Sequence, residues 1–386
     1  MSPIENAVRL TQELIRCPSV TPNDAGALEI VETALRGAGF KTHRIKFSHA
    51  ETPDVENLFA KIGTGAPHLA FAGHTDVVPP GDVTRWRHAP FAGDIVDGRL
   101  YGRGASDMKG AIGAFLAATL NFISCHGAPQ GTLSFLITGD EEGPSINGTV
   151  KLLDWMRARG EKLDHCIVGE PTNVCALGDT IKIGRRGSLN GVIRVIGKQG
   201  HVAYPHRAEN PTPVIARIVA ALSAYEFDQG TSHFDPTNLE FSSIDIGNPA
   251  VNVIPATATA QFNVRFNDLW TLATLEARIR HIVAQTAGQI TTHLEFLPSN
   301  AVSFLTEPGI FSDLVVNAVK QVTGRTPELS TSGGTSDARF ISHDCPTLEF
   351  GLTNETIHAV DENATTADIK MLEEIYRHIL ISYFKT

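Results

Sequence analysis

The sequence lacks the features that would place the protein in a membrane or on a nucleic acid. No apolar run approaches the roughly 20 residues that a membrane-spanning helix needs. The first residues do not combine a cationic start with an apolar run, so we expect no secretory signal peptide. The formal net charge is -10, and the 32 basic residues form no run that could follow phosphates. We therefore expect neither a membrane nor a nucleic-acid partner.

Cysteine is scarce and follows no motif. The five cysteines are odd in number and far apart, and no CxxC occurs. This pattern is typical of a reduced, cytoplasmic compartment. Internal repeats and low-complexity tracts are also missing, and 386 residues are enough for two domains.

Helix-like and strand-like segments alternate in the first part of the chain. Helical spacing of apolar residues predicts helices at 5–16, 25–38, 108–125 and 148–159. Apolar runs predict strands at 41–46, 57–62, 67–72, 132–138 and 164–169. This alternation predicts a parallel or mixed sheet with helices on both faces. Ligands of such sheets bind beyond the carboxyl ends of the strands.

The middle of the chain has a different order of elements. It predicts strands at 188–197, 239–247, 257–267 and 291–296 and helices at 211–225 and 272–286. The order β-α-β-β-α-β is that of a ferredoxin-like unit. We therefore expect an α+β domain at 184–296, inserted into a mixed-sheet α/β catalytic domain made of 1–183 and 297–386. The second part of that domain would hold helices 310–323 and 366–383, strand 347–351 and a Gly-rich loop at 330–337.

Histidine and acidic residues recur in short Gly-bounded segments, most of them after apolar runs. The set is His74, Asp76, Asp107, Glu141, Glu142, Glu170 and His358. Such side chains are costly to keep at the ends of buried strands without a partner. Zinc accepts imidazole nitrogen and carboxylate oxygen, and two metals about 3.5–4 Å apart can share a carboxylate. The set predicts a two-metal site bridged by Asp107, with terminal ligands His74, Glu142, Glu170 and His358.

Two members of the set are predicted to act without binding metal. Asp76 lies two residues beyond His74 and is placed to accept the proton on the other imidazole nitrogen. Glu141 adjoins Glu142, and successive residues of an extended segment point to opposite sides. Glu141 could therefore take a proton from an attacking water and deliver it to a leaving amine. The implied chemistry is hydrolysis of an acyl bond.

Each of these residues has an ordinary interpretation when it is taken alone. The His-x-Asp pair could lie on the surface, Glu141-Glu142 could be an acidic loop, and Glu170-Pro171 could be a turn. His358 could be a surface histidine. The combination favours the metal site, although nitrogen and oxygen ligands accept Zn, Co or Mn alike.

Four motifs resemble the cocatalytic zinc aminoacylase and carboxypeptidase-type metallopeptidases. They are GHTDVVPPGD (73–82), YGRGASDMKG (101–110), TGDEEG (138–143) and GEPT (169–172). The resemblance covers nearly the whole chain and implies two Zn2+ per subunit, for which Co2+ can substitute. It implies one ion on His74 and Glu170 and another on Glu142 and His358, with Asp107 between them. Glu141 would be the general base and acid, and Asp76 a further active-site residue.

The resemblance also implies a homodimer formed through the inserted domain, which would act as a lid. His201 would then reach the partner's active site and stabilise a tetrahedral oxyanion. His201 follows Gly200 in a loop and is far in sequence from every predicted ligand. A surface histidine of the lid is the alternative.

Further motifs resemble those of family members that act on a small N-succinyl amino acid, and this resemblance implies a substrate rich in carboxylates. They are GRRGSLNG (184–191), KQGHVAYPHRAENP (198–211), NVIP (252–255), SGGTSDARF (332–340) and ETIHAVDE (355–362). Arginine binds carboxylates bidentately, and successive backbone amides can form an anion nest. The candidate substrate contacts are Arg185, Tyr204, Asn252, Arg265, Gly334, Thr335 and Arg339. For each arginine the alternative is a surface ion pair.

Two other functions are compatible with the same motifs. A related N-acyl-amino-acid deacylase, such as acetylornithine deacetylase, or a dipeptidase would use the same metal set on another substrate. A non-catalytic ligand-binding relative would typically lack the proton shuttle or a ligand. Here Glu141 and all five predicted ligands are present.

Overall fold

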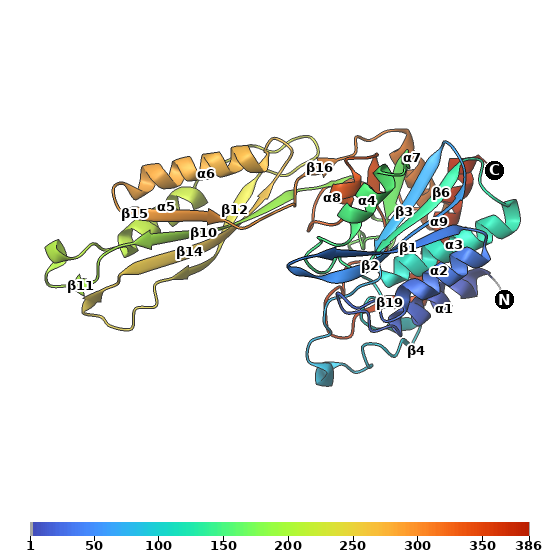
Figure 1. The fold of residues 1–386 in the computed structure, drawn as a ribbon, viewed down its shortest axis with the longest axis horizontal. Coiled ribbons are helices and arrows are strands. Elements are labelled where there is room, and N and C mark those ends of the chain that lie inside the picture. The colour runs from blue at the N-terminus through green and yellow to red at the C-terminus, as the bar shows by residue number, and fades with distance from the viewer. Residues whose placement is uncertain (1–2, 386) are drawn as a thin grey trace. The chain divides into compact units, whose positions relative to one another are not determined.

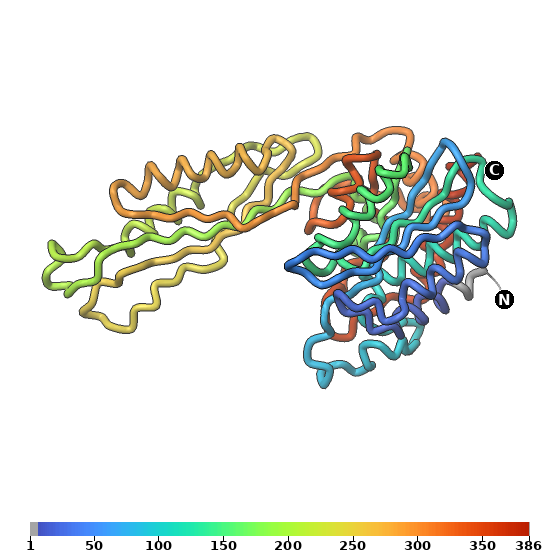
Figure 2. Tube along the Cα trace, in the orientation of Figure 1, coloured from blue at the N-terminus to red at the C-terminus, as the bar shows by residue number. Residues whose placement is uncertain are grey.

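A computed structural model describes residues 3–385 and divides the chain into two units. Unit 1 contains the residues up to Ile183 together with Thr306–Ser330 and the residues from Ser336 onward. Unit 2 contains Gly184–Leu305 and the short segment Thr331–Thr335. Figure 2 shows that both ends of the chain build unit 1, whereas its green-to-orange middle builds unit 2.

Eight strands form the central sheet of unit 1. They are β1 (Lys41–His49), β2 (Thr52–Gly63), β3 (His68–His74), β6 (Thr132–Thr138), β7 (His165–Val168), β8 (Thr180–Lys182), β17 (Glu328–Ser330) and β18 (Thr347–Glu349). Their order in the sheet is β1-β2-β6-β3-β7-β18-β8-β17. The strands from β6 to β18 pair parallel, whereas β1, β2 and β6 pair antiparallel, as do β18 and β8. Every residue of β3 and β6 is buried, as expected of strands covered on both faces.

Two groups of helices pack on this sheet (Figure 1). The helices of unit 1 are α1 (Pro3–Ile15), α2 (Ala27–Gly37), α3 (Lys109–His126), α4 (Thr149–Arg157), α7 (Ile310–Thr323), α8 (Ala338–Ile341) and α9 (Thr366–Phe384), with a 3-10 turn η1 (Val83–Arg85). Helices α1, α3 and α9 contact one another, and α3 packs on β3. Helix α4 packs on β2 and β6 and contacts α8. A separate small sheet joins β4 (Asp94–Val96), β5 (Arg99–Tyr101) and β19 (Asn363–Thr365).

Unit 2 has a four-stranded antiparallel sheet with two helices. The main elements are β10 (Gly187–Ile196), α5 (Thr212–Ser223), β12 (Asn238–Asp245), β14 (Thr257–Phe266), α6 (Leu272–Ala287) and β15 (Thr291–Phe296). The strand order β12-β14-β10-β15 is that of a ferredoxin-like β-α-β-β-α-β unit. Buried and less buried residues alternate along β14, because one face of this strand packs on α5.

Short elements lie at the two ends of the unit 2 sheet. They are β9 (Gly184–Arg185), β11 (Gly200–His201), η2 (Pro205–Arg207), β13 (Val253–Ile254) and β16 (Phe304–Leu305). Strand β9 pairs with β16, and β11 pairs with β13. Figure 1 shows β11 and β16 at opposite ends of this unit.

The structure confirms the predicted α/β class with a mixed central sheet and the order of the long elements. The short strands β4, β5, β8, β17 and β19 were not predicted, because three residues are too few to show a hydrophobic period. None of the helices within residues 3–385 is long and apolar enough to cross a membrane.

Candidate metal centre

Three parallel strands carry candidate ligands to one edge of the central sheet. Strand β3 lies between β6 and β7, and its last residue His74 pairs with Thr138, the last residue of β6. Glu141 and Glu142 follow β6, and Glu170 follows β7 by two residues. Because neighbouring parallel strands end at the same edge, these side chains are brought together.

Asp107 and His358 reach the same place from two loops. Asp107 lies two residues before α3, and His358 lies in the turn between β18 and β19. His358 has a φ of 58°, which is uncommon for a residue with a Cβ. Such backbone strain persists where surrounding contacts fix the chain, and it is frequent at functional sites.

The structure brings all five predicted ligands into one cluster. Nε2 of His74 lies 3.3 Å from Oδ1 of Asp107 and 3.8 Å from Oε1 of Glu170. Nε2 of His358 lies 3.3 Å from Oδ2 of Asp107 and 2.9 Å from Oε1 of Glu142. Asp107 thus turns one oxygen toward each imidazole. The cluster has two halves that share Asp107.

Two buried atoms of this cluster show that its donors suit a metal. Nε2 of His74 and Oδ1 of Asp107 are buried, and neither has a hydrogen-bond partner among the described residues. They lie 3.3 Å from each other, and two buried polar atoms that lack a hydrogen bond would be costly in a fold that did not use them. Imidazole nitrogen and carboxylate oxygen are the donors that Zn2+ and similar divalent metals accept. The residues therefore fit a pair of metal ions.

The negative charge of the cluster changes the pKa values of its members. Asp107 and Glu142 raise the pKa of His358 to about 10. Burial lowers the pKa of His74, but Asp107 and the other carboxylates outweigh it and raise the pKa well above its usual range. A field that holds protons this strongly also favours a divalent cation.

Glu141 lies in the same cluster and differs from Glu142 in direction. Its Oε2 lies 3.9 Å from Nε2 of His74, whereas Glu142 contacts His358. Burial, and then the charge of Glu170, raise the pKa of Glu141 well above its usual range. A raised pKa makes the carboxylate a stronger base, which suits a group that must accept a proton and release it.

Asp76 contacts the cluster in a way that the sequence did not predict. The hydrogen bond from His74 Nδ1 goes to the backbone oxygen of Asp76, at 2.9 Å, and the carboxylate is 3.6 Å away. The carboxylate instead accepts the backbone N–H groups of Glu142, at 3.1 Å, and Glu141, at 3.4 Å, and the hydroxyl of Thr21, at 2.7 Å. Asp76 therefore ties the His74 strand to the loop of the two glutamates.

A buried ion pair that was not predicted from the sequence contacts the loop that carries Asp107. Arg103 Nη1 is 2.8 Å from Oε2 of Glu362, and both side chains are buried. Glu362 also accepts three backbone N–H groups from the loop that carries Asp107. Both residues lie within quoted motifs, but spacing alone does not show that they are partners.

The substrate contacts predicted in unit 2 form two groups. Arg185 lies by the Gly-rich loop and donates to the backbone oxygen of Ser332 at 3.3 Å. His201, Tyr204 and Asn252 lie around β11 and β13, at the opposite end of the unit (Figure 1). Unit 2 therefore does not bring Arg185 together with His201.

Arg265 of unit 2 is half-buried and has a second arginine nearby. Burial, and then the charge of Arg186, lower the pKa of Arg265. Arg186 was not predicted as a contact, and its Nη1 donates to Asn238 at 3.1 Å. Two neighbouring guanidinium groups favour an anionic ligand. Gly334 and Thr335 belong to the segment Thr331–Thr335 of the same unit.

Arg339 belongs to unit 1 and is buried. Its Nη1 donates to the backbone oxygen of Ser336 at 2.7 Å, and its guanidinium lies 4.1 Å from the ring centre of Phe340. These contacts fix Arg339 within its own segment. Its proposed role with substrate stays a prediction.

His201 is exposed and has a defined hydrogen bond. Its Nδ1 accepts the backbone N–H of Ala203 at 3.1 Å. The neutral imidazole then carries its proton on Nε2. In this form His201 can donate a hydrogen bond to a developing negative charge.

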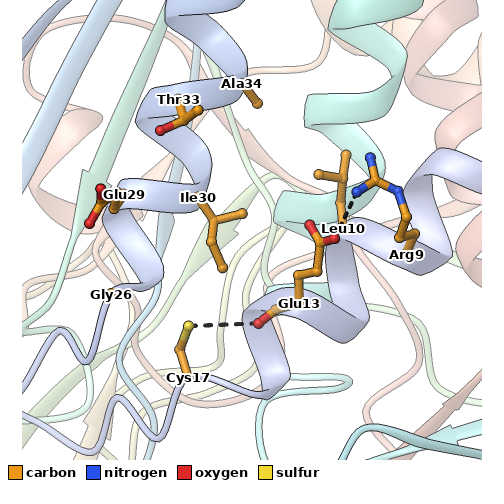
Figure 3. A pocket seen from close by; sticks show the side chains of 9 residues that line it. All are labelled: Arg9, Leu10, Glu13, Cys17, Gly26, Glu29, Ile30, Thr33 and Ala34. Carbon is orange, nitrogen blue, oxygen red and sulfur yellow. Dashed lines mark hydrogen bonds and ion pairs between the residues drawn. The ribbon is translucent and has the colours of Figure 1, made fainter.

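A cavity of about 490 Å³ lies between α1 and α2, away from the cluster. Figure 3 shows side chains that line it, among them Leu10 and Ile30, and the ion pair of Arg9 with Glu13. Its lining contains none of the predicted ligands or substrate contacts. This cavity therefore does not compete with the carboxylate cluster as the functional site.

The chain belongs to peptidase family M20/M25/M40, whose sequence profile matches residues 70–382. This confirms the resemblance seen in the motifs. Two relatives that match over nearly their full length are both named succinyl-diaminopimelate desuccinylase. The protein from Rhodopseudomonas palustris (strain BisA53) is 59% identical over 381 residues, which is 98% of each chain. The protein from Afipia carboxidovorans is 58% identical and covers 99% of this chain and 100% of its own length.

Solved structures of distant relatives share the fold. The aminopeptidase PepT from Bacillus cereus has a TM-score of 0.81 at 19% identity, covering 99% of each chain. A dinuclear metal binding peptidase of the M20 family from Bacillus subtilis has a TM-score of 0.71 at 15% identity, covering 100% of this chain and 99% of that one. At this identity the likeness concerns the fold alone.

Proposed function

We propose that this protein hydrolyses the amide bond of N-succinyl-LL-2,6-diaminopimelate to succinate and LL-2,6-diaminopimelate, in diaminopimelate and lysine biosynthesis. The observation that carries this proposal is the identity of 59% and 58% to two relatives named for this reaction, over essentially the whole chain. The ligand cluster and the candidate proton shuttle are both present in this chain. The protein is therefore proposed to be a metal-dependent amidohydrolase.

Two Zn2+ ions per subunit are the proposed cofactor, with Co2+ as a substitute. We assign one ion to His74 and Glu170, the other to Glu142 and His358, and Asp107 to both. The two oxygens of Asp107, each facing one imidazole at 3.3 Å, support this assignment. When bound, the ions would supply Lewis acidity at the scissile carbonyl.

Glu141 is proposed to move the proton in this reaction. It would accept a proton from the attacking water and pass it to the leaving amine. Its raised pKa supports the role, because burial and the neighbouring Glu170 charge make its carboxylate a stronger base. Asp76 is proposed to hold Glu141 in position through the backbone N–H groups of Glu141 and Glu142.

Arginines and the lid are proposed to recognise the substrate. Arg185, Arg265 and Arg339 would bind its carboxylates, with Gly334, Thr335, Tyr204 and Asn252 as further contacts. The neighbouring charges of Arg186 and Arg265 support an anionic ligand. We further propose a cytoplasmic homodimer formed through unit 2, in which His201 serves the partner's site. The proton that His201 carries on Nε2 supports a donor role.

A substrate panel with metal analysis on one preparation tests the reaction. The purified protein, loaded with Zn2+ or Co2+, is assayed on N-succinyl-LL-2,6-diaminopimelate, N-acetylornithine and dipeptides. We expect the succinylated substrate to be hydrolysed fastest, with two metal ions per chain. Faster hydrolysis of N-acetylornithine would instead show a related deacylase.

Glu141→Gln tests the proton shuttle separately. The amide keeps the shape of the side chain but cannot accept a proton, so kcat should fall by about 10²–10⁴-fold. Metal content should stay at the wild-type level, because Glu141 is not an assigned ligand. A variant with near-normal kcat would contradict the role.

A further inference from the structure

Glu362 is a fully buried carboxylate that accepts hydrogen bonds at both oxygens. Its Oε1 accepts the backbone N–H groups of Ser106, at 2.9 Å, and Asp107, at 3.1 Å. Its Oε2 accepts the backbone N–H of Gly104 at 3.1 Å and Nη1 of Arg103 at 2.8 Å. A fully buried carboxylate needs such donors to offset its desolvation, and here three of the four are backbone N–H groups of one loop. That loop ends in the assigned bridging ligand.

Arg103 extends the same network to the other loop of the cluster. Its Nη2 lies 3.4 Å from the backbone oxygen of His358. Its guanidinium lies 5.2 Å from the ring centre of Trp86, and its side chain is 3% exposed. Ser106 adds a second link, because its hydroxyl donates to the backbone oxygen of Thr353. The loop of Asp107 and the turn of His358 are thus joined by partly buried polar contacts.

We propose that Glu362 is a positioning residue that sets the Asp107 loop and the His358 turn relative to each other, so that one buried carboxylate tunes both metal sites. The inference rests on the metal assignment of the proposed function. Asp107 is shared by the two sites, and His358 belongs to one of them. A shift of either loop changes the distance between Asp107 and its imidazole partners. Partners that orient ligands in this way typically change metal affinity about 10–100-fold when they are replaced.

Glu362→Gln tests this proposal with little change of shape. Glutamine keeps one carbonyl oxygen and replaces the other carboxylate oxygen by an NH2 group. This NH2 group must then face two donors that the carboxylate oxygen accepted. The two donors are either those of Gly104 and Arg103 or those of Ser106 and Asp107. Metal-stripped full-length protein is titrated with Co2+, followed by calorimetry and by visible absorption. We expect about 10–100-fold weaker binding and an altered cobalt spectrum, in a variant whose far-UV circular dichroism is unchanged.

Glu373→Gln is the matched control, because Glu373 is also a buried glutamate and contacts none of the assigned ligands. It should bind Co2+ as the wild type does.

Folded Glu362→Gln protein that binds Co2+ with the affinities and the spectrum of the wild type overturns the proposal. If Glu362→Gln does not fold, Arg103→Lys is titrated instead. A lysine at this position can donate to Glu362 or to the backbone oxygen of His358, but not to both. Weaker Co2+ binding by this variant supports the proposal, and unchanged Co2+ binding overturns it. Wild-type protein that binds no Co2+ refutes the metal assignment itself.

Discussion

Glu373 is buried without the partners that Glu362 has. It lies in α9, is 3% exposed, and its Oε2 has no hydrogen-bond partner among the described residues. Burial, and then the charge of Glu374, raise its pKa from 4.5 to about 7, against the opposing effect of the Ala7 amide and Arg377. Near neutral pH this residue should therefore lower the stability of the fold.

The sign and size of the effect follow from the two pKa values. In the unfolded chain Glu373 ionises near 4.5 and in the folded chain near 7. Because the folded pKa is raised, the stability linked to this group is fully present below 4.5 and is lost as the pH rises through 7. At about 1.4 kcal/mol for each pK unit, the whole difference amounts to about 3 kcal/mol.

Glu373→Gln removes this titration and should stabilise the protein more at higher pH. We expect a gain of about 1 kcal/mol at about pH 5.5 and about 3 kcal/mol at about pH 8. Urea unfolding of the metal-stripped protein, followed by circular dichroism, measures the free energy of unfolding at both pH values. The difference between the two gains is the decisive quantity, because the effect of the amide itself does not depend on pH. Equal gains at both values would refute the reasoning.

Glu374→Gln tests the second cause of the raised pKa of Glu373, which is the charge of Glu374. Glu374 is partly exposed, and its ion pair with Arg377 holds its pKa below the usual range. Without the charge of Glu374 the pKa of Glu373 is raised less, so the effect of Glu374→Gln on stability should become more favourable as the pH rises, by a smaller amount than for Glu373→Gln. A surface pair of this kind contributes about 0–1 kcal/mol.

Two further predictions concern the substrate contacts of unit 2. Arg265→Lys should raise KM for the succinylated substrate about 10-fold, because lysine cannot bind a carboxylate bidentately and a charge-assisted hydrogen bond is worth about 1.5 kcal/mol. Unchanged KM and kcat would remove Arg265 from the site. Gly333→Ala should also raise KM about 10-fold at wild-type metal content, since its φ is +102° and a Cβ there would lie 2.5 Å from Nη1 of Arg185. Steady-state kinetics with metal analysis measures both variants, and a wild-type KM for Gly333→Ala would mean that the position of Arg185 does not matter.

The long elements could be predicted because their periods are local. The predicted strand 132–138 and helix 310–323 coincide with β6 and α7. Strands β8 and β17 could not be predicted, since each has three residues and its stability comes from pairing in the central sheet. The spacing of apolar residues does not predict such pairing.

The proposed ligands and proton shuttle at the ends of β3, β6 and β7 could be predicted from the apolar runs before them, but the contacts that hold them could not. The sequence suggested that the Asp76 carboxylate faces His74, whereas the structure turns it toward the amides of Glu141 and Glu142. The partner of Glu362 lies far away in the chain, and only the fold shows that both side chains are buried. Contacts of this kind depend on burial, which spacing does not reveal.

The discontinuous course of unit 1 constrains the order in which the protein can mature on the ribosome. Strand β18 lies between β7 and β8 in the sheet, yet it is made after the whole of Gly184–Leu305. The last assigned ligand, His358, is made later still. Domains generally fold as units during synthesis, so unit 2 can fold while unit 1 still lacks an internal strand. The complete set of proposed ligands is therefore present only when synthesis is almost finished, and a chain truncated before His358 would lack one of them.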